Sequence, residues 1–221
     1  MTTEVRVKLS SIYMSITIAI IAITCLISWQ GFNNPTLFNN LKHYPYVEHR
    51  HKEYHRLLSS GFLHGSTMHL AINMYVLWVF GEFVEDQFVA QYGAMMGRFL
   101  YVIAYLITIL LADIPTHFTK QNDPNYAAIG ASGGTSGIIM IFILFRPWSE
   151  LLFYFVLPIP AIIFGLLYLG YSSWASKNSN DNIGHSAHFW GAIAGVAIAL
   201  ILLPESSRAF IQQIGNIPYF N

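Results

Sequence analysis

Long apolar runs, separated by short polar segments, dominate the pattern of this chain. Six such runs can be delimited, and most approach the length of a membrane-crossing helix. They cover approximately Ile12–Trp29, Met68–Val84, Ala94–Ala112, Ser132–Phe145, Leu151–Tyr171 and His188–Pro204. About 20 apolar residues in a helix cross the hydrocarbon core of a bilayer. The pattern therefore predicts an all-α membrane protein, built as a bundle of six transmembrane helices.

The composition indicates the same class of protein. Of the 221 residues, 54% are hydrophobic and 10% are charged, whereas soluble domains carry about 25% charged residues. Eleven basic residues balance eleven acidic ones, which excludes a polybasic nucleic-acid binder. The single cysteine, Cys25, cannot form an internal disulfide or a cysteine metal cluster. We therefore expect one integral membrane domain over residues 1–221, embedded in a lipid bilayer, with no cofactor and no metal.

The connection between the first two runs, about residues 30–67, is long enough to be folded. Its histidines could bind a metal, but a solvated run at the membrane surface is the favoured interpretation. These histidines are His43, His49, His51 and His55. Arg6 and Lys8 precede the first run and favour a cytoplasmic N-terminus. Six spans then return the C-terminus to the same side, and we expect a bacterial plasma membrane.

Polar side chains begin the even-numbered runs, although such groups are costly in lipid. His64, His69 and Asn73 lie at the start of the second run. Ser132 begins the fourth run and His188 begins the sixth. Because consecutive spans alternate in direction, the even-numbered runs enter the membrane from the same side. Counting alone therefore predicts one composite polar site in one leaflet.

The fourth run is too short to cross the bilayer by itself. From Ser132 to the charged boundary at Arg146 it provides about 14 residues, or roughly 21 Å of helix, against a hydrocarbon core of about 30 Å. Its N-terminus should therefore lie below the membrane surface. The preceding segment, 121–130, must then enter as irregular backbone, which is tolerated where it lines protein or a wet cavity.

This geometry suits acyl transfer. A serine hydroxyl becomes a nucleophile when a base removes its proton, and a neutral imidazole is the usual base. A helix N-terminus supplies N–H groups for a developing oxyanion, and His69 and Asn73 could add side-chain donors. No Asp or Glu lies near either candidate partner within the predicted spans. The parts therefore fit a Ser–His dyad formed by Ser132 and His188.

Two other interpretations apply to these small residues. A stretch rich in Gly, Ser and Ala in a membrane helix is most often a packing surface, and Gly191 and Gly195 have the spacing for it. The pattern G-x-S-x-G at residues 130–134 also matches the nucleophile turn of soluble hydrolases, but that turn requires a preceding strand. Only the occurrence of polar residues on three spans of one leaflet favours catalysis.

Three motifs together resemble those of the rhomboid family of intramembrane serine proteases. The glycine–any–serine–glycine motif is at 130–133. The histidine–four residues–histidine–three residues–asparagine motif is at 64–73. The alanine–histidine–two residues–glycine–three residues–glycine motif is at 187–195. The resemblance covers about residues 54–203.

The resemblance implies a role for each matching residue. Ser132 would be the nucleophile and His188 the general base. The Ser132 amide, His69 and Asn73 would form the oxyanion hole. Structural or supporting roles are implied for His64, Arg56, Glu85, Gly130, Gly133, Gly191 and Gly195.

One position departs from the family pattern. The residue four after the serine is often aromatic and stacked on the catalytic imidazole, but here it is Ser136. Phe189 or Trp190 could compensate for the missing ring. Ser136 is also a rival nucleophile on the same helix face. Ser132 is favoured because it lies at the helix N-terminus, where N–H groups are free.

The family resemblance implies a substrate that is a transmembrane protein, cut in or beside its helix and admitted laterally from the lipid. Pro158 and Pro160 would kink the fifth helix at such a gate, and loop 172–183 would form a mobile cap. The main alternative is a catalytically silent rhomboid-like protein that binds transmembrane clients. A small transporter or channel is less favoured, because the related halves typical of transporters are not visible. Its polar path would consist of His69, Asn73, His185 and His188.

Overall fold

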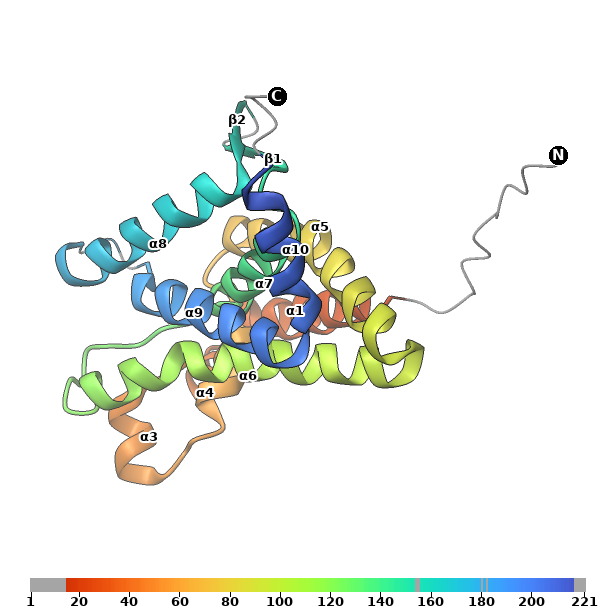
Figure 1. Cartoon of the computed structure of the whole chain (residues 1–221). Coiled ribbons are helices and arrows are strands. Elements are labelled where there is room, and N and C mark those ends of the chain that lie inside the picture. Colours follow the sequence, from red (N-terminus) through yellow and green to blue (C-terminus); the bar gives the residue numbers. More distant parts are fainter. Residues whose placement is uncertain (1–14, 154–155, 180, 182, 217–221) are drawn as a thin grey trace, which may run out of the picture.

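The structure is a computed structural model that describes residues 15–153, 156–179, 181 and 183–216 (Figure 1). The described chain is mainly helical, so the predicted all-α membrane bundle is confirmed as the fold class. Its elements are α1 (Ile16–Asn33), α2 (Pro35–Leu41), α3 (Pro45–His51), α4 (Arg56–Ser59), the 3-10 helix η1 (Ser60–Phe62), α5 (Thr67–Tyr92), α6 (Ala94–Lys120), α7 (Ser132–Phe145), β1 (Glu150–Phe153), β2 (Leu157–Pro160), α8 (Ala161–Asn178), α9 (His185–Leu202) and α10 (Pro204–Ile214). Figure 1 shows α7 in the middle of the bundle, with α5, α6 and α9 around it.

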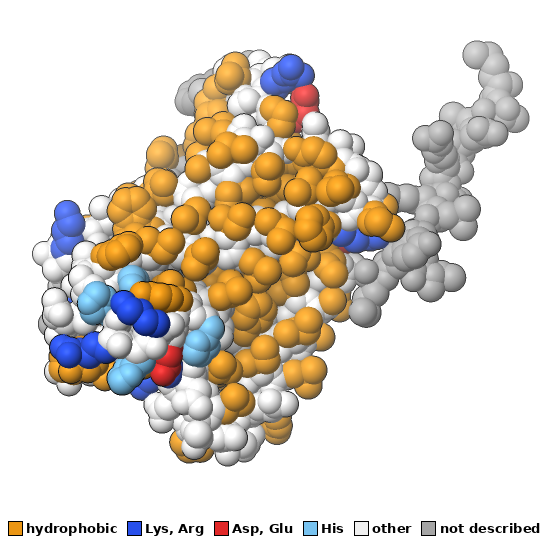
Figure 2. Space-filling view, turned by 90° about the horizontal axis from the view of Figure 1, so that it is seen from below, with side chains coloured by type: hydrophobic (Ala, Val, Ile, Leu, Met, Phe, Trp, Pro, Cys, Tyr) orange, Lys and Arg blue, Asp and Glu red, His pale blue; other side chains and the backbone are white. Residues whose placement is uncertain are grey.

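Four of the described helices, α1, α5, α6 and α9, are long and apolar enough to cross a membrane. The helix α7 is apolar but has only 14 residues, as the fourth run predicts. Figure 2 shows hydrophobic side chains across the middle of one face, with charged and histidine side chains at its margins, as a lipid-facing surface requires. The beginning of the first predicted run, Ile12, lies outside the described residues, as do Arg6 and Lys8.

The fifth predicted run, Leu151–Tyr171, is not one continuous helix. Strands β1 and β2 pair antiparallel at its start, with Leu152 opposite Pro158. Pro158 and Pro160 therefore lie in a strand and do not kink α8, so that prediction was wrong. Proline lacks an N–H donor and is tolerated in an edge strand, while α8 begins directly after Pro160.

The predicted cap over the site is also corrected. Residues 172–178 of the expected loop form the last turns of α8. Their polar side chains do not prevent helix formation, because the side chain of Asn178 donates to the carbonyl of Trp174 one turn earlier (2.7 Å). Asn180 and Asn182, which belong to the same expected loop, lie outside the described residues.

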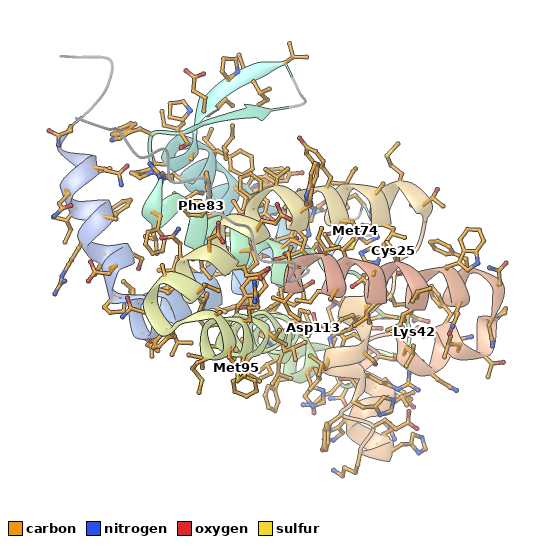
Figure 3. All side chains as sticks on the ribbon, turned by 90° about the vertical axis from the view of Figure 1, so that its right-hand side faces the viewer. Cys25, Lys42, Met74, Phe83, Met95 and Asp113 are labelled. Atoms are coloured by element: carbon orange, nitrogen blue, oxygen red, sulfur yellow. The ribbon has the colours of Figure 1, made fainter. Side chains whose placement is uncertain are left out.

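The connection 30–67 is folded, as its length predicts. It contains the last residues of α1, then α2, α3, α4 and η1. The buried Arg56 donates to the carbonyl of Asn39 (2.5 Å) and pairs with Glu53 (2.6 Å). Ser60 donates to Asp113 on α6 (3.0 Å); in Figure 3, Asp113 marks the part of α6 on which this connection packs. Polar interactions thus hold the first connection together, and a hydrogen bond attaches it to α6 of the bundle.

One histidine of this connection was wrongly expected to be solvated. His43 is fully buried, while His49, His51 and His55 are exposed. The carboxylate of the buried Glu48 accepts from the rings of His43 and His117 (2.7 Å each). Burial tends to raise the pKa of Glu48, but these hydrogen bonds outweigh it and hold the pKa below its ordinary value. His43 is buried because this carboxylate provides it with a partner.

Glu85 of α5 binds the beginning of α1. Its carboxylate accepts from the backbone N–H groups of Ile16 (3.1 Å) and Thr17 (3.0 Å), and from the hydroxyl of Ser15 (2.7 Å). Arg98 at the start of α6 donates to the same carboxylate (3.0 Å). A carboxylate at a helix N-terminus satisfies free donors and complements the helix dipole. Glu85 therefore ties α1, α5 and α6 together at one end of the bundle.

The helices α7 and α9 pack backbone against backbone. A Cβ atom added to Gly191 would overlap the backbone of Gly133, lying 2.7 Å from its carbonyl carbon. One turn further along, a Cβ atom on Gly195 would lie 2.7 Å from the carbonyl carbon of Gly137. Small residues allow such close approach of membrane helices. Glycine at these positions brings the helix that begins at Ser132 against the helix that carries His188.

We expect Gly191→Ala to destabilise the bundle, because the new methyl group must push α9 away from α7. The expected cost is about 1–3 kcal/mol, typical of overpacking, and a lower thermal midpoint in detergent measures it. The matched control is Gly170→Ala on α8, where an added Cβ atom meets nothing within 4 Å. Equal midpoints for the two variants would contradict this account of the α7–α9 contact.

Candidate active site

Ser132 is the first residue of α7, and the irregular segment before it is bonded to the first connection. His43 and Ala128 exchange two backbone hydrogen bonds (3.0 and 2.9 Å), and the N–H of Gly130 donates to the carbonyl of Ser60 (3.0 Å). Irregular backbone at membrane depth requires such partners within the protein. The N-terminus of α7 is therefore positioned by contacts on both sides of the segment.

Gly130 allows the ring of His69 to lie beside Ser132. Its φ of +122° is rarely adopted by residues with a side chain. A Cβ atom there would lie 2.9 Å from Nε2 of His69 and 3.8 Å from Oγ of Ser132. The imidazole of His69 and the hydroxyl of Ser132 therefore lie around the same point.

His64 braces the residue before the serine. The N–H of Ala131 donates to Nε2 of His64 (3.3 Å), so Nδ1 carries the proton in the neutral ring. That proton is donated to Oγ of Ser28 on α1 (2.9 Å), and Ser28 donates in turn to the carbonyl of Phe62 (3.0 Å). The chain of bonds connects α1 to the start of α7. His64 also contacts the ring of His69 edge to face, with ring centroids 4.9 Å apart.

Asn73 lies one turn after His69 on α5, and both the nitrogen and the oxygen of its side-chain amide have partners. Its Nδ2 donates to the carbonyl of His69 (2.9 Å). Its Oδ1 lies 3.3 Å from Oγ1 of Thr135 on α7, whose one hydrogen is shared between Asn73 and the carbonyl of Ser132 (3.2 Å). Sequence reasoning did not identify Thr135. Its position three residues after Ser132, on the helix face next to α5, was the available signal. The pair fixes the Asn73 amide relative to α7.

The ring of His188, in the first turn of α9, is stacked on Tyr168 of α8. The ring centroids are 5.9 Å apart and the planes differ by 22°. Phe189 and Trp190, considered for this role, contact each other edge to face (5.3 Å). Sequence reasoning missed Tyr168. A tyrosine within an apolar run was the only signal, because this contact is tertiary.

Ser136, the rival nucleophile, is buried and engaged. Its hydroxyl donates to the carbonyl of Ser132 (2.6 Å). A serine has one hydrogen to donate, so the hydroxyl of Tyr168 must donate to Oγ of Ser136 (2.5 Å). A hydroxyl held in this way is poorly placed to attack a substrate.

His185 lies between His188 and a carboxylate, that of Asp181. Asp181 accepts from Nε2 of His185 (3.0 Å), and this bond lowers the pKa of Asp181 to about 2. The ring of His185 meets His188 edge to face, with centroids 5.9 Å apart. The carboxylate therefore bonds to a neighbour of His188, and among the described residues it reaches His188 only through His185.

A cavity of about 660 Å³ brings the candidate residues together. It lies among α5, α7, α8 and α9, and Ser132, His188, His69 and Asn73 all line it, as does Tyr168. Apolar side chains, among them Ile72 of α5 and Phe164 of α8, complete its walls. A cavity with a few convergent polar groups and apolar walls is the usual form of a binding or active site.

Comparison with known proteins identifies a family that this chain matches. A sequence model of the Rhomboid domain matches residues 51–205. RHOMBOID-like protein 12, mitochondrial, of Arabidopsis thaliana is 27% identical over 183 residues, which are 79% of this chain and 54% of that protein. Rhomboid-like protein 11, chloroplastic, of the same plant is 24% identical over 76% of this chain and 60% of its own length. The chain therefore spans little more than half of these two relatives.

A bacterial relative is matched over more of its length. Rhomboid protease GlpG of Haemophilus influenzae is 26% identical over 167 residues, which are 75% of this chain and 78% of that protein. The match to the Rhomboid domain covers well over half of the chain. The protein is thus an integral, multi-pass membrane protein that belongs to the rhomboid family.

Proposed function

We propose that this protein is an intramembrane serine endopeptidase that cleaves membrane-anchored proteins in or beside a transmembrane helix. The observation that carries the proposal is the shared cavity, in which Ser132 at a helix N-terminus and the His188 ring line the same space. Two relatives whose names call them rhomboid proteases support it. One is GlpG, and the other is GluP of Bacillus subtilis, which is 30% identical over 73% of this chain and 29% of its own length.

The proposed reaction proceeds through an acyl-enzyme. Oγ of Ser132 bonds to the scissile carbonyl carbon while its proton passes to His188. The C–N bond then breaks, and His188 returns the proton to the leaving nitrogen. Water attacks the resulting ester with its proton passing to His188, which restores the hydroxyl of Ser132 and releases the new carboxyl end.

The negative charge that develops on the carbonyl oxygen needs donors already in place. The first N–H groups of an α-helix have no partner within the helix, and Ser132 begins α7. We propose that its N–H, the ring of His69 and the amide of Asn73 bind this oxygen. The positions of His69 around Gly130 and of Asn73 against Thr135 support the assignment.

We expect a fluorophosphonate probe to label the purified protein in mild detergent and in bilayers. Labelling should be lost in Ser132→Ala, which lacks the nucleophile, and in His188→Ala, which lacks the base. Ser136→Ala should still be labelled, because its hydroxyl is not the attacking group. Gel fluorescence measures the labelling of the wild type and of the three variants.

Two outcomes would contradict this assignment. Labelling that survives Ser132→Ala would show that another serine reacts. A wild-type protein that stays unlabelled in both detergent and bilayers would instead favour the catalytically silent protein that binds transmembrane clients.

The oxyanion assignment predicts a second effect. His69→Ala and Asn73→Ala should each reduce kcat for a single-span substrate by roughly 10²-fold, as loss of one oxyanion donor does elsewhere. The matched control is His55→Ala, because His55 is exposed in the first connection. Unchanged kcat in both cavity variants, with the control also unchanged, would remove these residues from the oxyanion hole.

We propose that the substrate reaches the cavity laterally, between α5 and α8. Both helices line the cavity, and both expose large apolar side chains on their outer faces. Ile72 on α5 combines the two properties, since it lines the cavity and is 55% exposed. Side chains of both helices pack against α7, which also lines the cavity.

Linking α5 to α8 tests this route. Ile72→Cys and Phe164→Cys, in a Cys25→Ser background, would be joined by a bifunctional thiol reagent. Cleavage of a transmembrane substrate should fall at least about tenfold, while the small fluorophosphonate probe still labels Ser132. The singly substituted proteins treated with the same reagent are the controls, and Phe164→Cys among them measures what loss of the ring that stacks on Tyr168 does by itself. Unchanged cleavage after complete linking would refute lateral access between these helices.

The membrane itself is assigned only in part. The apolar helices and the family establish a multi-pass membrane protein. A bacterial plasma membrane with both termini in the cytoplasm stays a proposal based on the sequence. The names of the two plant relatives refer to mitochondria and chloroplasts, so family membership does not choose among these membranes.

A further inference from the structure

We propose that Tyr168 of α8 is a positioning residue for His188, and that Ser136 fixes Tyr168 in this role. The inference deepens the proposed protease function and rests on it. It assigns to α8 a part in orienting the base, in addition to forming a wall of the cavity.

The first support is a stack of three rings. Phe164 and Tyr168 lie one turn apart on α8, with ring centroids 5.7 Å apart and planes 14° from parallel. Tyr168 continues the stack onto His188 at 5.9 Å and 22°. An imidazole can rotate about two side-chain bonds, and a flat neighbour restricts this rotation. The orientation of the His188 ring is therefore restricted by the ring of Tyr168, which belongs to another helix.

The second support is a hydrogen-bonded path back to the nucleophile. Tyr168 donates to Ser136, and Ser136 donates to the carbonyl of Ser132. Ser136 is only 1% exposed, so water does not compete strongly for this bond. The backbone of Ser132 is therefore connected through Ser136 and Tyr168 to the face of His188. This path relates the position of the base to that of the group it must deprotonate.

The third support is the absence of a ring at position 136. With Ser136 on α7, that helix supplies a hydroxyl in place of a ring, and the small side chain leaves the hydroxyl end of Tyr168 in contact with it. The serine at 136 and the tyrosine at 168 therefore work as a pair. The small side chain of Ser136 leaves space for the hydroxyl of Tyr168, and that hydroxyl donates to Ser136.

The test uses the saturation kinetics of fluorophosphonate labelling, which separate the inactivation rate of the bound probe from its apparent affinity. Tyr168→Leu removes the ring and should lower the inactivation rate about tenfold or more, since a small misplacement of a reacting group has effects of this size. The apparent affinity should change less than about twofold. Tyr168→Phe keeps the ring but loses the bond to Ser136, so its inactivation rate should lie between those of the wild type and Tyr168→Leu.

The hydrogen bond is tested separately with a double-mutant cycle. Tyr168→Phe and Ser136→Ala remove opposite ends of one bond, so each should slow inactivation by a similar factor. The double variant should then be no slower than either single variant. Additive effects would show that the two residues act independently, which would overturn the pairing.

The control on α8 is Leu167→Ala, because Leu167 is 61% exposed and does not line the cavity. Thermal midpoints in detergent identify any variant that fails to fold, and if Tyr168→Leu is one, the cycle carries the test. An inactivation rate in folded Tyr168→Leu within twofold of Leu167→Ala would overturn the proposal. A wild type that is not labelled at all would instead overturn the protease function itself.

Discussion

The close contact between the backbones of α7 and α9 is the constraint on which the site depends. Lipid tails provide no hydrophobic force that drives two apolar helices together, so shape and close packing decide their association. Glycines on both helices permit the contact. Because α7 begins with Ser132 and the first turn of α9 carries His188, one helix crossing determines how the two candidate catalytic groups face each other.

A second constraint is that α7 begins inside the protein, at Ser132. A helix that begins below the membrane surface needs partners for the backbone that leads to it. Here the partners come from the first connection and from His64, which joins α1 to Ala131. The buried polar groups of the first connection, including Glu48 and Arg56, are therefore part of the support of the site.

Much of this architecture could be predicted from the sequence, and the exceptions have physical reasons. The bounds of α7 could be predicted because small residues and a charged Arg146 delimit its apolar run. The hairpin at Glu150–Pro160 could not, because a short apolar segment fits a strand as well as a helix. Counting spans predicts that the polar residues converge on one site, and His69, Asn73, Ser132 and His188 line one cavity. Tyr168 and Thr135 could not be found, because their partners lie on other helices.

The ring stack on α8 has a consequence for the timing of the reaction. A displacement of α8 large enough to widen the lateral opening would also carry Tyr168 away from His188. Admission of a bulky helix and alignment of the base would then be mutually exclusive states of one helix. The proposed cleavage would then be confined to the state in which α8 holds Tyr168 against His188.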